Sequence, residues 1–150
     1  MDVPLPTRLF SLREANALLG TLNEEFTRAR QLRDELMGIQ QQLQEAGSGI
    51  DGPDVAVDPS APQPVQRLQS RAVRIIDKLR DILHEVAELG VEVKAADGLV
   101  DFRSKLHGRT VYLCWKYGED RVGYFHELDT GFSGRRPLPD DGDFTGDFLH

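Results

Sequence analysis

The sequence predicts an α+β protein, in which a long antiparallel helical hairpin, similar to a coiled coil, is followed by a three- to four-stranded antiparallel β-meander packed on it. Two stretches, 11–46 and 64–90, repeat apolar residues at steps of three and four, which is typical of one face of a helix. From Val91 the repeat changes to two, which is typical of strands. A chain of 150 residues fits one hydrophobic core, so we expect a single domain over 1–150.

The first helix, expected over 11–46, begins at a capping box. In the sequence Ser11-Leu-Arg-Glu14 the serine hydroxyl accepts from the Glu14 amide, and the carboxylate accepts from the Ser11 amide. Phe10 precedes this cap at the position of a hydrophobic staple residue. Gly47 follows the last periodic residues and is expected to end the helix.

The connector 47–63 is rich in Gly, Pro, Ser and Asp and has no repeat, so it is expected to be a flexible linker with little to bury. Pro64 then opens the second helix, where its missing N–H costs nothing, and Gly90 is the expected C-cap. The two apolar seams are expected to be buried against each other, in a hairpin within one chain or in a dimeric bundle. The second helix also has a basic flank, expected to face solvent and to pair with acidic residues of the first helix. Its members are Arg67, Arg71, Arg74 and Lys78.

The segment 91–137 is expected to form the meander and a loop rich in Gly and Arg, and 138–150 an acidic tail. Short turns divide the meander into three expected strands. These strands cover 99–103, 109–117 and 121–127.

The turn lengths also predict a register, in which Phe102 lies opposite Leu113, Leu113 opposite Phe125, and Trp115 opposite Gly123. Gly123 would leave room for the indole. One face of the sheet is then a core face, which carries Val100, Phe102, Val111, Leu113, Trp115 and Phe125. The opposite face, called the polar face below, is expected to be half-exposed. It carries Asp101, Arg103, Tyr112, Cys114, Lys116, Tyr124 and His126.

Charge and composition exclude several classes of protein. The formal charge of −7 resides in the acidic connector and tail, and a near-neutral body argues against nucleic-acid binding. No apolar run approaches the roughly 20 residues that span a bilayer, and no secretory signal is visible. The single cysteine, Cys114, makes no internal disulfide, which fits a cytoplasmic protein.

Short motifs of the chain resemble those of a known family. They are Gly98-Leu-Val-Asp-Phe102, Val111-Tyr-Leu-Cys-Trp115, Gly118-Glu119, His126-Glu127 and Gly131-Phe-Ser-Gly-Arg135, with 10–16 and 90–94. By their order and spacing the chain resembles the prokaryotic domain-of-unknown-function family 2203 over 9–138, outside the connector. The resemblance implies a helical hairpin that carries a small sheet, and it implies no established activity, cofactor or catalytic residue. Phe125 stands where we expect the family to have an indole, and a large aromatic residue still fills that core position.

Three kinds of chemistry are open on the polar face and in the loop after it. A metal site would use N and O ligands that suit zinc or manganese, although residues 126 and 127 point to opposite faces of a strand. The candidate ligands are His126, Glu127 and Asp129, with Glu119 or Asp101. A cysteine nucleophile would need Cys114 beside His126, but the two are diagonal and Cys114 lies in mid-strand. An anion site would use the glycine-rich turn 131–136, with its guanidiniums and backbone N–H groups.

For each of these sites a structural role is the simpler interpretation. Surface hydrogen bonds explain the acidic residues, and an ion pair of Arg135 with Glu127 or Asp129 explains the arginine turn. A further alternative is that Phe144 and Phe148 of the tail cover the tyrosines of the polar face.

The sequence therefore favours a non-enzymatic role, as a self-associating interaction or scaffold module with a binding site on the polar face or the arginine loop. The hypothetical binding residues are Asp101, Arg103, Tyr112, Tyr124, His126, Arg135 and Arg136. The alternative is a small ligand-binding protein or metal-dependent enzyme on the face of Tyr112, His126 and Arg135. We expect a homodimer, with a protein or a small anionic ligand as a further partner, and no cofactor, membrane or nucleic acid.

Overall fold

The computed structural model describes residues 8–48 and 55–147, and the chain divides into two compact units. One, the sheet unit, comprises Met1–Phe26 and Leu83–His150, and the other, the hairpin unit, comprises Thr27–Ile82. The expectation of a single domain over 1–150 stays a prediction. Residues 49–54 of the expected linker and 148–150 of the expected tail, Phe148 among them, lie outside the described residues.

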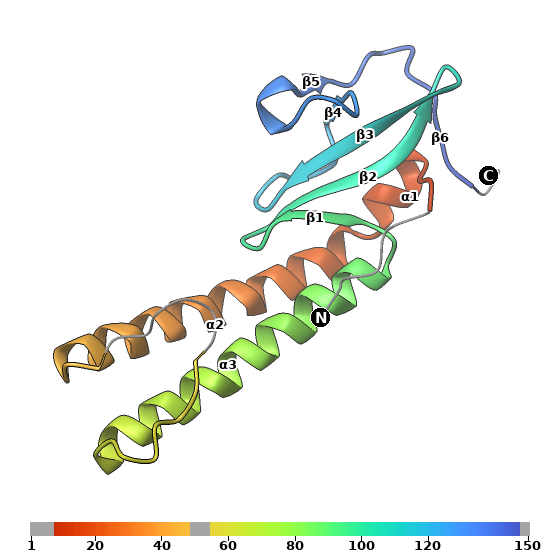
Figure 1. Ribbon diagram of the computed structural model, residues 1–150. Helices are drawn as coiled ribbons and strands as arrows, with labels where there is room; N and C mark the ends of the chain where they lie inside the picture. The colour runs from red at the N-terminus through yellow and green to blue at the C-terminus, as the bar shows by residue number, and fades with distance from the viewer. Residues whose placement is uncertain (1–7, 49–54, 148–150) are drawn as a thin grey trace. The chain divides into compact units, whose positions relative to one another are not determined.

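Three helices carry the predicted three-four periodicity. They are α1 Leu12–Ala17, α2 Leu19–Glu45 and α3 Gln63–Glu88 (Figure 1). The capping box is confirmed, since Glu14 N donates to Ser11 Oγ at 3.1 Å and Ser11 N donates to Glu14 Oε1 at 2.9 Å. The expected first helix is interrupted at Leu18, whose amide donates to the Ala15 carbonyl at 3.2 Å and so tightens one turn. In the described part of the chain no helix has both the length and the apolar character needed to cross a bilayer.

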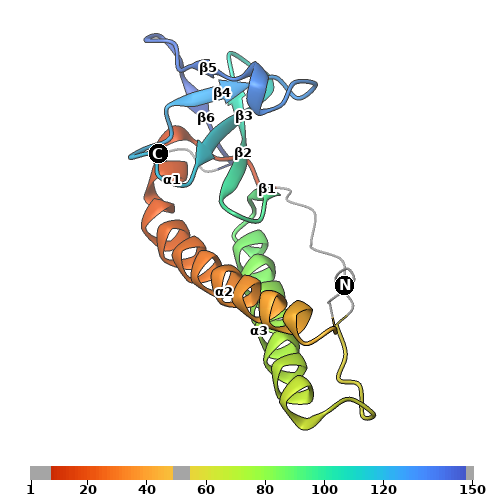
Figure 2. The same cartoon turned by 90° about the vertical axis from the view of Figure 1, so that its left-hand side faces the viewer.

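The hairpin unit consists of antiparallel segments of α2 and α3, which lie side by side in both views (Figures 1 and 2). Residues from both predicted seams form its buried core. The buried apolar residues are Ile39, Leu43, Val65, Ala72 and Ile75. The two seams therefore cover each other within one chain, because each helix alone has a narrow apolar stripe to bury.

The described part of the connector, 55–62, differs from a linker that buries little. Val55 and Ala61 are partly buried against the hairpin core. The Asp58 carboxylate accepts hydrogen bonds from the Ser60 amide at 2.9 Å and from its hydroxyl at 2.6 Å. The Asp58 amide donates to Gln69 Oε1 of α3 at 2.9 Å. Two apolar side chains and a local turn thus hold this proline-rich stretch on the hairpin.

Among the residues that the structure describes, the sheet unit contains six strands in an antiparallel sheet. They are β1 Glu92–Ala95, β2 Leu99–Leu106, β3 Arg109–Lys116, β4 Tyr124–His126, β5 Arg136–Pro137 and β6 Phe144–Thr145. The order is β1-β2-β3-β4-β5, and β6 pairs with β2 (Figure 1). The expected three to four strands were too few, because β5 and β6 have two residues each and such strands show no repeat.

The predicted register is confirmed at the centre of the sheet. Phe102 pairs with Leu113, and Leu113 pairs with Phe125. His107 and Gly108 have φ angles of 51° and 83°, as a two-residue hairpin turn requires.

The strand β4 begins at Tyr124 and is shorter than expected. The backbone before it is bound elsewhere, since the Glu119 carbonyl accepts from the Trp115 indole at 3.0 Å and the Val122 amide donates to Asn16 Oδ1 at 2.8 Å. The expected pair of Trp115 and Gly123 is absent from the described pairing, and a side chain at Gly123 would meet open space. Gly123 therefore does not make room for the indole.

Three segments that are far apart in the sequence close one edge of β2. β1 pairs with its beginning and β6 with its end, at Lys105 and Leu106. Between them the Phe10 amide donates to the Arg103 carbonyl at 2.7 Å. The edge is thus covered along its length, which protects it from pairing with another chain.

The core face is buried as predicted, with Phe125 the most exposed of its six residues at 5%. Aromatic residues just before α1 and within α2 pack on it: the Phe10 ring lies 5.4 Å from Phe102, and the Phe26 ring 6.3 Å from Trp115. Phe144 of β6 is also buried, with its ring 5.8 Å from Phe125. Phe144 therefore completes the core face, and the alternative that it covers the tyrosines of the polar face was wrong.

Candidate functional site

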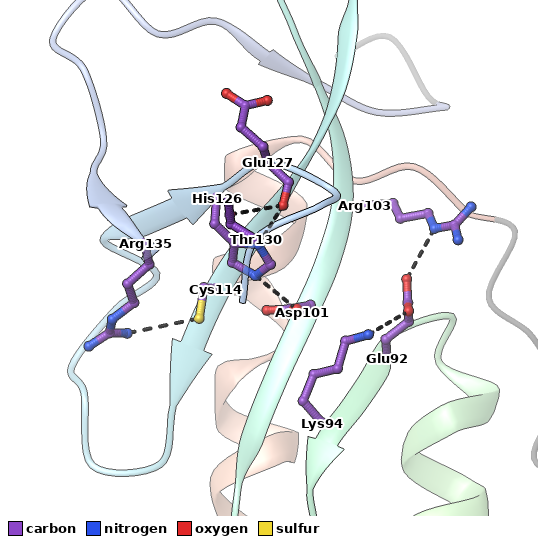
Figure 3. Close-up of polar contacts among 9 residues, drawn as sticks. All are labelled: Glu92, Lys94, Asp101, Arg103, Cys114, His126, Glu127, Thr130 and Arg135. Carbon is purple, nitrogen blue, oxygen red and sulfur yellow. Dashed lines mark hydrogen bonds and ion pairs between the residues drawn. The ribbon is translucent and has the colours of Figure 1, made fainter. Parts of the chain in front are cut away.

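The polar face of the sheet is largely covered, not half-exposed. Asp101, Tyr112, Cys114 and His126 are 3, 8, 0 and 2% exposed. The segment after β4 folds back beside His126, so that Thr130 and Arg135 lie near the same strands (Figure 3). The loop continues through a short 3₁₀ turn at Phe132–Gly134. Of the remaining members, Arg103 and Tyr124 are partly exposed and Lys116 is exposed.

A buried acid–histidine pair lies at the centre of this face. His126 Nε2 is 3.0 Å from Asp101 Oδ2, and His126 Nδ1 is 2.8 Å from the Glu127 carbonyl oxygen (Figure 3). A carbonyl oxygen only accepts, so Nδ1 carries a hydrogen and donates it to Glu127. The contact between Nε2 and Oδ2 then holds one shared proton. Burial raises the pKa of Asp101, and the neighbouring His126 opposes this shift.

The cysteine beside this pair is protonated. Burial, followed by the negative charge of Asp101, raises the pKa of the Cys114 thiol to about 12. The Arg135 guanidinium reaches Cys114 Sγ at 4.0 Å and opposes this shift without reversing it. A protonated, fully buried thiol is a poor nucleophile, so the geometry does not favour cysteine catalysis.

Arg135, a predicted binding residue, is held by an acidic partner. Its guanidinium donates to Glu119 through two hydrogen bonds, at 3.0 and 2.8 Å. It also stacks on Tyr124 and Phe132, with distances of 3.9 and 4.2 Å to the ring centroids. The expected ion pair with Glu127 or Asp129 was wrong for this arginine. A bidentate pair of this kind fixes the loop on β3 and β4 and leaves little of the charge for an anion.

Arg136, the second predicted arginine, pairs with Glu127 at 2.9 Å. Arg109 of β3 reaches the same carboxylate oxygen at 2.9 Å. Both arginine side chains are about 57% exposed, so these ion pairs are surface contacts of small energetic value.

A second polar cluster, which sequence reasoning missed, joins β1 to the polar face. Glu92 accepts from Lys94 Nζ and from Arg103 Nε, each at 3.0 Å (Figure 3). Burial of Glu92 opposes its ionisation, but hydrogen bonds from Tyr112, Lys94 and Arg103 outweigh this effect and lower its pKa. The sequence pattern that could have revealed this cluster is the alternation at 92–95, since it places Glu92 and Lys94 on one face of a strand.

The predicted metal ligands do not all gather at one point. Glu119 and Glu127 bind arginines, and Asp129 is exposed. His126 instead lies with Asp101, which was also a candidate ligand, and with Cys114. The ligand atoms of these three residues all lie within 4.8 Å of one another. Within the described residues, these three side chains are close enough together to hold a metal ion. The predicted register had already placed two residues of this group, Asp101 and Cys114, directly opposite each other on neighbouring strands.

The hairpin unit has a separate arginine-lined groove of about 430 Å³. It is lined by Val57, Gln63, Gln66, Arg67, Ser70, Arg71 and Arg74. Arg71 pairs with Glu35 at 3.1 Å, as expected for the basic flank. Arg67 and Arg74 make no ion pair with the residues that the structure describes.

The comparisons with known proteins give one result. The model of a family described as "Uncharacterized conserved protein (DUF2203)" matches residues 8–138 of the chain. No curated protein and no solved structure matches it.

Proposed function

Since this chain belongs to the DUF2203 family of uncharacterised conserved proteins, whose description states no activity, we propose from its geometry that it is a self-associating interaction module. The hairpin unit is the surface that associates, and a second copy of the chain is its partner. The proposal keeps the homodimer expected from the two narrow seams.

The observation that carries this proposal is the incomplete burial of the hairpin core. Two helices cover each other on one side only, so the apolar residues at the edges of their contact stay partly exposed. Leucines of both helices are in this position. They are Leu32 and Leu36 of α2, with Leu68 and Leu79 of α3. A second hairpin placed on these edges would complete a four-helix bundle, the usual way of burying such stripes.

Sedimentation equilibrium of the full chain tests the proposal. We expect a dimer of twice 16.8 kDa, which weakens when Leu36 is changed to Gln. Met37→Gln is the matched control, because Met37 is the next residue of the same helix and is already 58% exposed. A wild-type chain that stays monomeric at tens of micromolar would reject self-association. Equal weakening by both substitutions would place the contact on another surface.

A second candidate function is supported by the arginine-lined groove. Arg67 and Arg74 carry charges that the described residues leave uncompensated, whereas Arg135 and Arg136 bind Glu119 and Glu127. An acidic segment of a partner protein would complement this groove better than the arginine loop named from the sequence.

Binding of a fluorescent oligo-aspartate peptide, followed by anisotropy at two salt concentrations, tests this candidate. Arg67→Gln with Arg74→Gln is expected to weaken binding at least tenfold. Arg80→Gln removes one charge from the same helix outside the groove and is expected to have little effect. If the Arg80 variant loses as much affinity, the attraction is a general charge effect and the groove is not the site.

The alternative role, a small ligand-binding protein or metal-dependent enzyme on the face of Tyr112, His126 and Arg135, is supported in one respect. The polar face holds a buried group of potential metal ligands. A catalytic role would further need a substrate cavity at this group.

A further inference from the structure

The side chains of Asp101, Cys114 and His126 come from three neighbouring strands, β2, β3 and β4. Asp101 pairs directly with Cys114, and His126 lies one row further along the sheet. All three are buried, and their ligand atoms lie within 4.8 Å of one another (Figure 3). From this arrangement we infer that Asp101, Cys114 and His126 form a binding site for a zinc ion, independent of self-association by the hairpin.

The histidine is oriented as a metal ligand. Its Nδ1–H donates to the Glu127 carbonyl at 2.8 Å, and the same carbonyl accepts from the Thr130 amide at 3.3 Å. Metal-bound histidines usually donate their second ring N–H to a carbonyl or carboxylate in this way, which fixes the tautomer and the ring. The lone pair of Nε2 is then directed at Asp101.

The aspartate presents a further unmet requirement. Nε2 and Oδ2 are two acceptors that face each other, so a positively charged species must lie between them: a proton, or a metal ion that replaces it. The second oxygen, Oδ1, is buried and has no hydrogen-bond partner among the described residues. A shared proton leaves Oδ1 unsatisfied, which costs the free energy of removing that oxygen from water. The Cys114 thiol lies beside this carboxylate, but it donates no hydrogen bond to Oδ1. A cation bound between the three groups would interact with both carboxylate oxygens or draw Oδ1 inward.

The chemistry of the three donors selects the metal. One nitrogen, one sulfur and one carboxylate oxygen suit zinc, whereas Mg²⁺ and Ca²⁺ prefer oxygen ligands alone. Tetrahedral zinc with bonds of about 2.0–2.3 Å has neighbouring ligands roughly 3.3–3.8 Å apart. A nitrogen or oxygen ligand lies roughly 3.5 Å from a sulfur ligand in this geometry, so atoms up to 4.8 Å apart would close by about 1.3 Å. Nε2 and Oδ2, at 3.0 Å, would open slightly. Three protein ligands leave a fourth position for a water molecule or a further ligand.

The charge of the site also fits. Zn²⁺ with an Asp101 carboxylate and a Cys114 thiolate is neutral overall, which is the condition for burying such groups. The adjacent Arg135 guanidinium is compensated by Glu119, and its N–H points at Sγ from 4.0 Å. Zinc binding displaces the thiol proton and the proton shared by the acid–histidine pair, and both protons leave to solvent.

The test uses the full-length chain after dialysis against a chelator, with Co²⁺ as a spectroscopic probe and Zn²⁺ as a competitor. One Co²⁺ per chain is expected, with visible bands of tetrahedral cobalt and a sulfur-to-cobalt charge-transfer band in the near ultraviolet. Zn²⁺ is expected to abolish both signals and to raise the melting temperature. Since the wild-type chain carries this readout, the test does not depend on any variant folding. Absence of the charge-transfer band at saturating Co²⁺ overturns the proposal.

Substitutions then assign the ligands. Cys114→Ser should abolish the charge-transfer band and weaken metal binding by more than the roughly 10–100-fold that changes around a metal site produce. His84→Gln is the matched control, because His84 pairs with Glu88 at 3.0 Å on the surface of α3, where adventitious metal would bind. Retention of the band in the His84 variant supports the site. Loss of the band in that variant overturns it.

Discussion

Leu43 and Leu79 are a matched pair of truncation sites in the hairpin unit. Leu43 is fully buried, whereas Leu79 is partly buried at the edge of the same core. Leu→Ala removes three carbons from each side chain, a transfer free energy of about 2.4 kcal/mol when burial is complete. The cavity left at Leu43 increases the loss to roughly 3–4 kcal/mol. At Leu79, where solvent already reaches the side chain, we expect a loss of stability of about 1–2 kcal/mol in the monomer.

Urea denaturation, followed by far-ultraviolet circular dichroism, measures both losses. The slope against urea should stay unchanged, so that a shifted midpoint reports stability alone. Gln42→Ala, at an exposed position next to Leu43, is the control and should change stability by less than about 0.5 kcal/mol. The dimer adds a second expectation, because a bundle that covers Leu79 makes its truncation approach the loss at Leu43 as protein concentration rises. A loss below about 1 kcal/mol at Leu43 would refute the burial of the seam.

Three further predictions concern the sheet unit. Burial alone would raise the pKa of Glu119, but hydrogen bonds from Arg135 outweigh this effect and lower that pKa. The pair therefore stabilises the fold above the ordinary glutamate pKa of about 4.3, and this contribution is lost as pH falls through the lower pKa of the folded state. Glu119→Gln should therefore reduce the loss of stability between pH 7 and pH 3, measured by thermal melts. Gly98→Ala should destabilise by well over 1 kcal/mol in urea, because φ is +120° and the new Cβ would lie 2.5 Å from Tyr117 Cβ. Ser11→Ala removes the confirmed cap and should lower stability by about 1 kcal/mol. The near-ultraviolet circular dichroism spectrum of the folded variant should stay the same as that of the wild-type chain, since the fold is intact.

The local elements of this protein follow from local signals in its sequence. The capping box fixed the start of the first helix, and the apolar steps of three and four fixed which faces of α2 and α3 are buried. Turn length sets strand register, so the two-residue turn at His107-Gly108 was enough to pair Phe102 with Leu113. A core face follows from register, because alternate side chains point to opposite sides of a strand.

The environment of the polar face was decided by tertiary structure. The predicted register placed its residues on one side of the sheet, but their burial depends on how the loop after β4 and the strand β1 pack there, and no local signal gives that packing. Arg135 could equally have met Glu119, Glu127 or Asp129, since a long flexible side chain reaches any of them and the fold alone selects Glu119. The fold also decides that the ligand atoms of Asp101, Cys114 and His126 come within 4.8 Å of one another. Register placed these residues on one face, but the directions of their side chains depend on the Glu127 carbonyl and on Arg135, which only the folded chain brings to them.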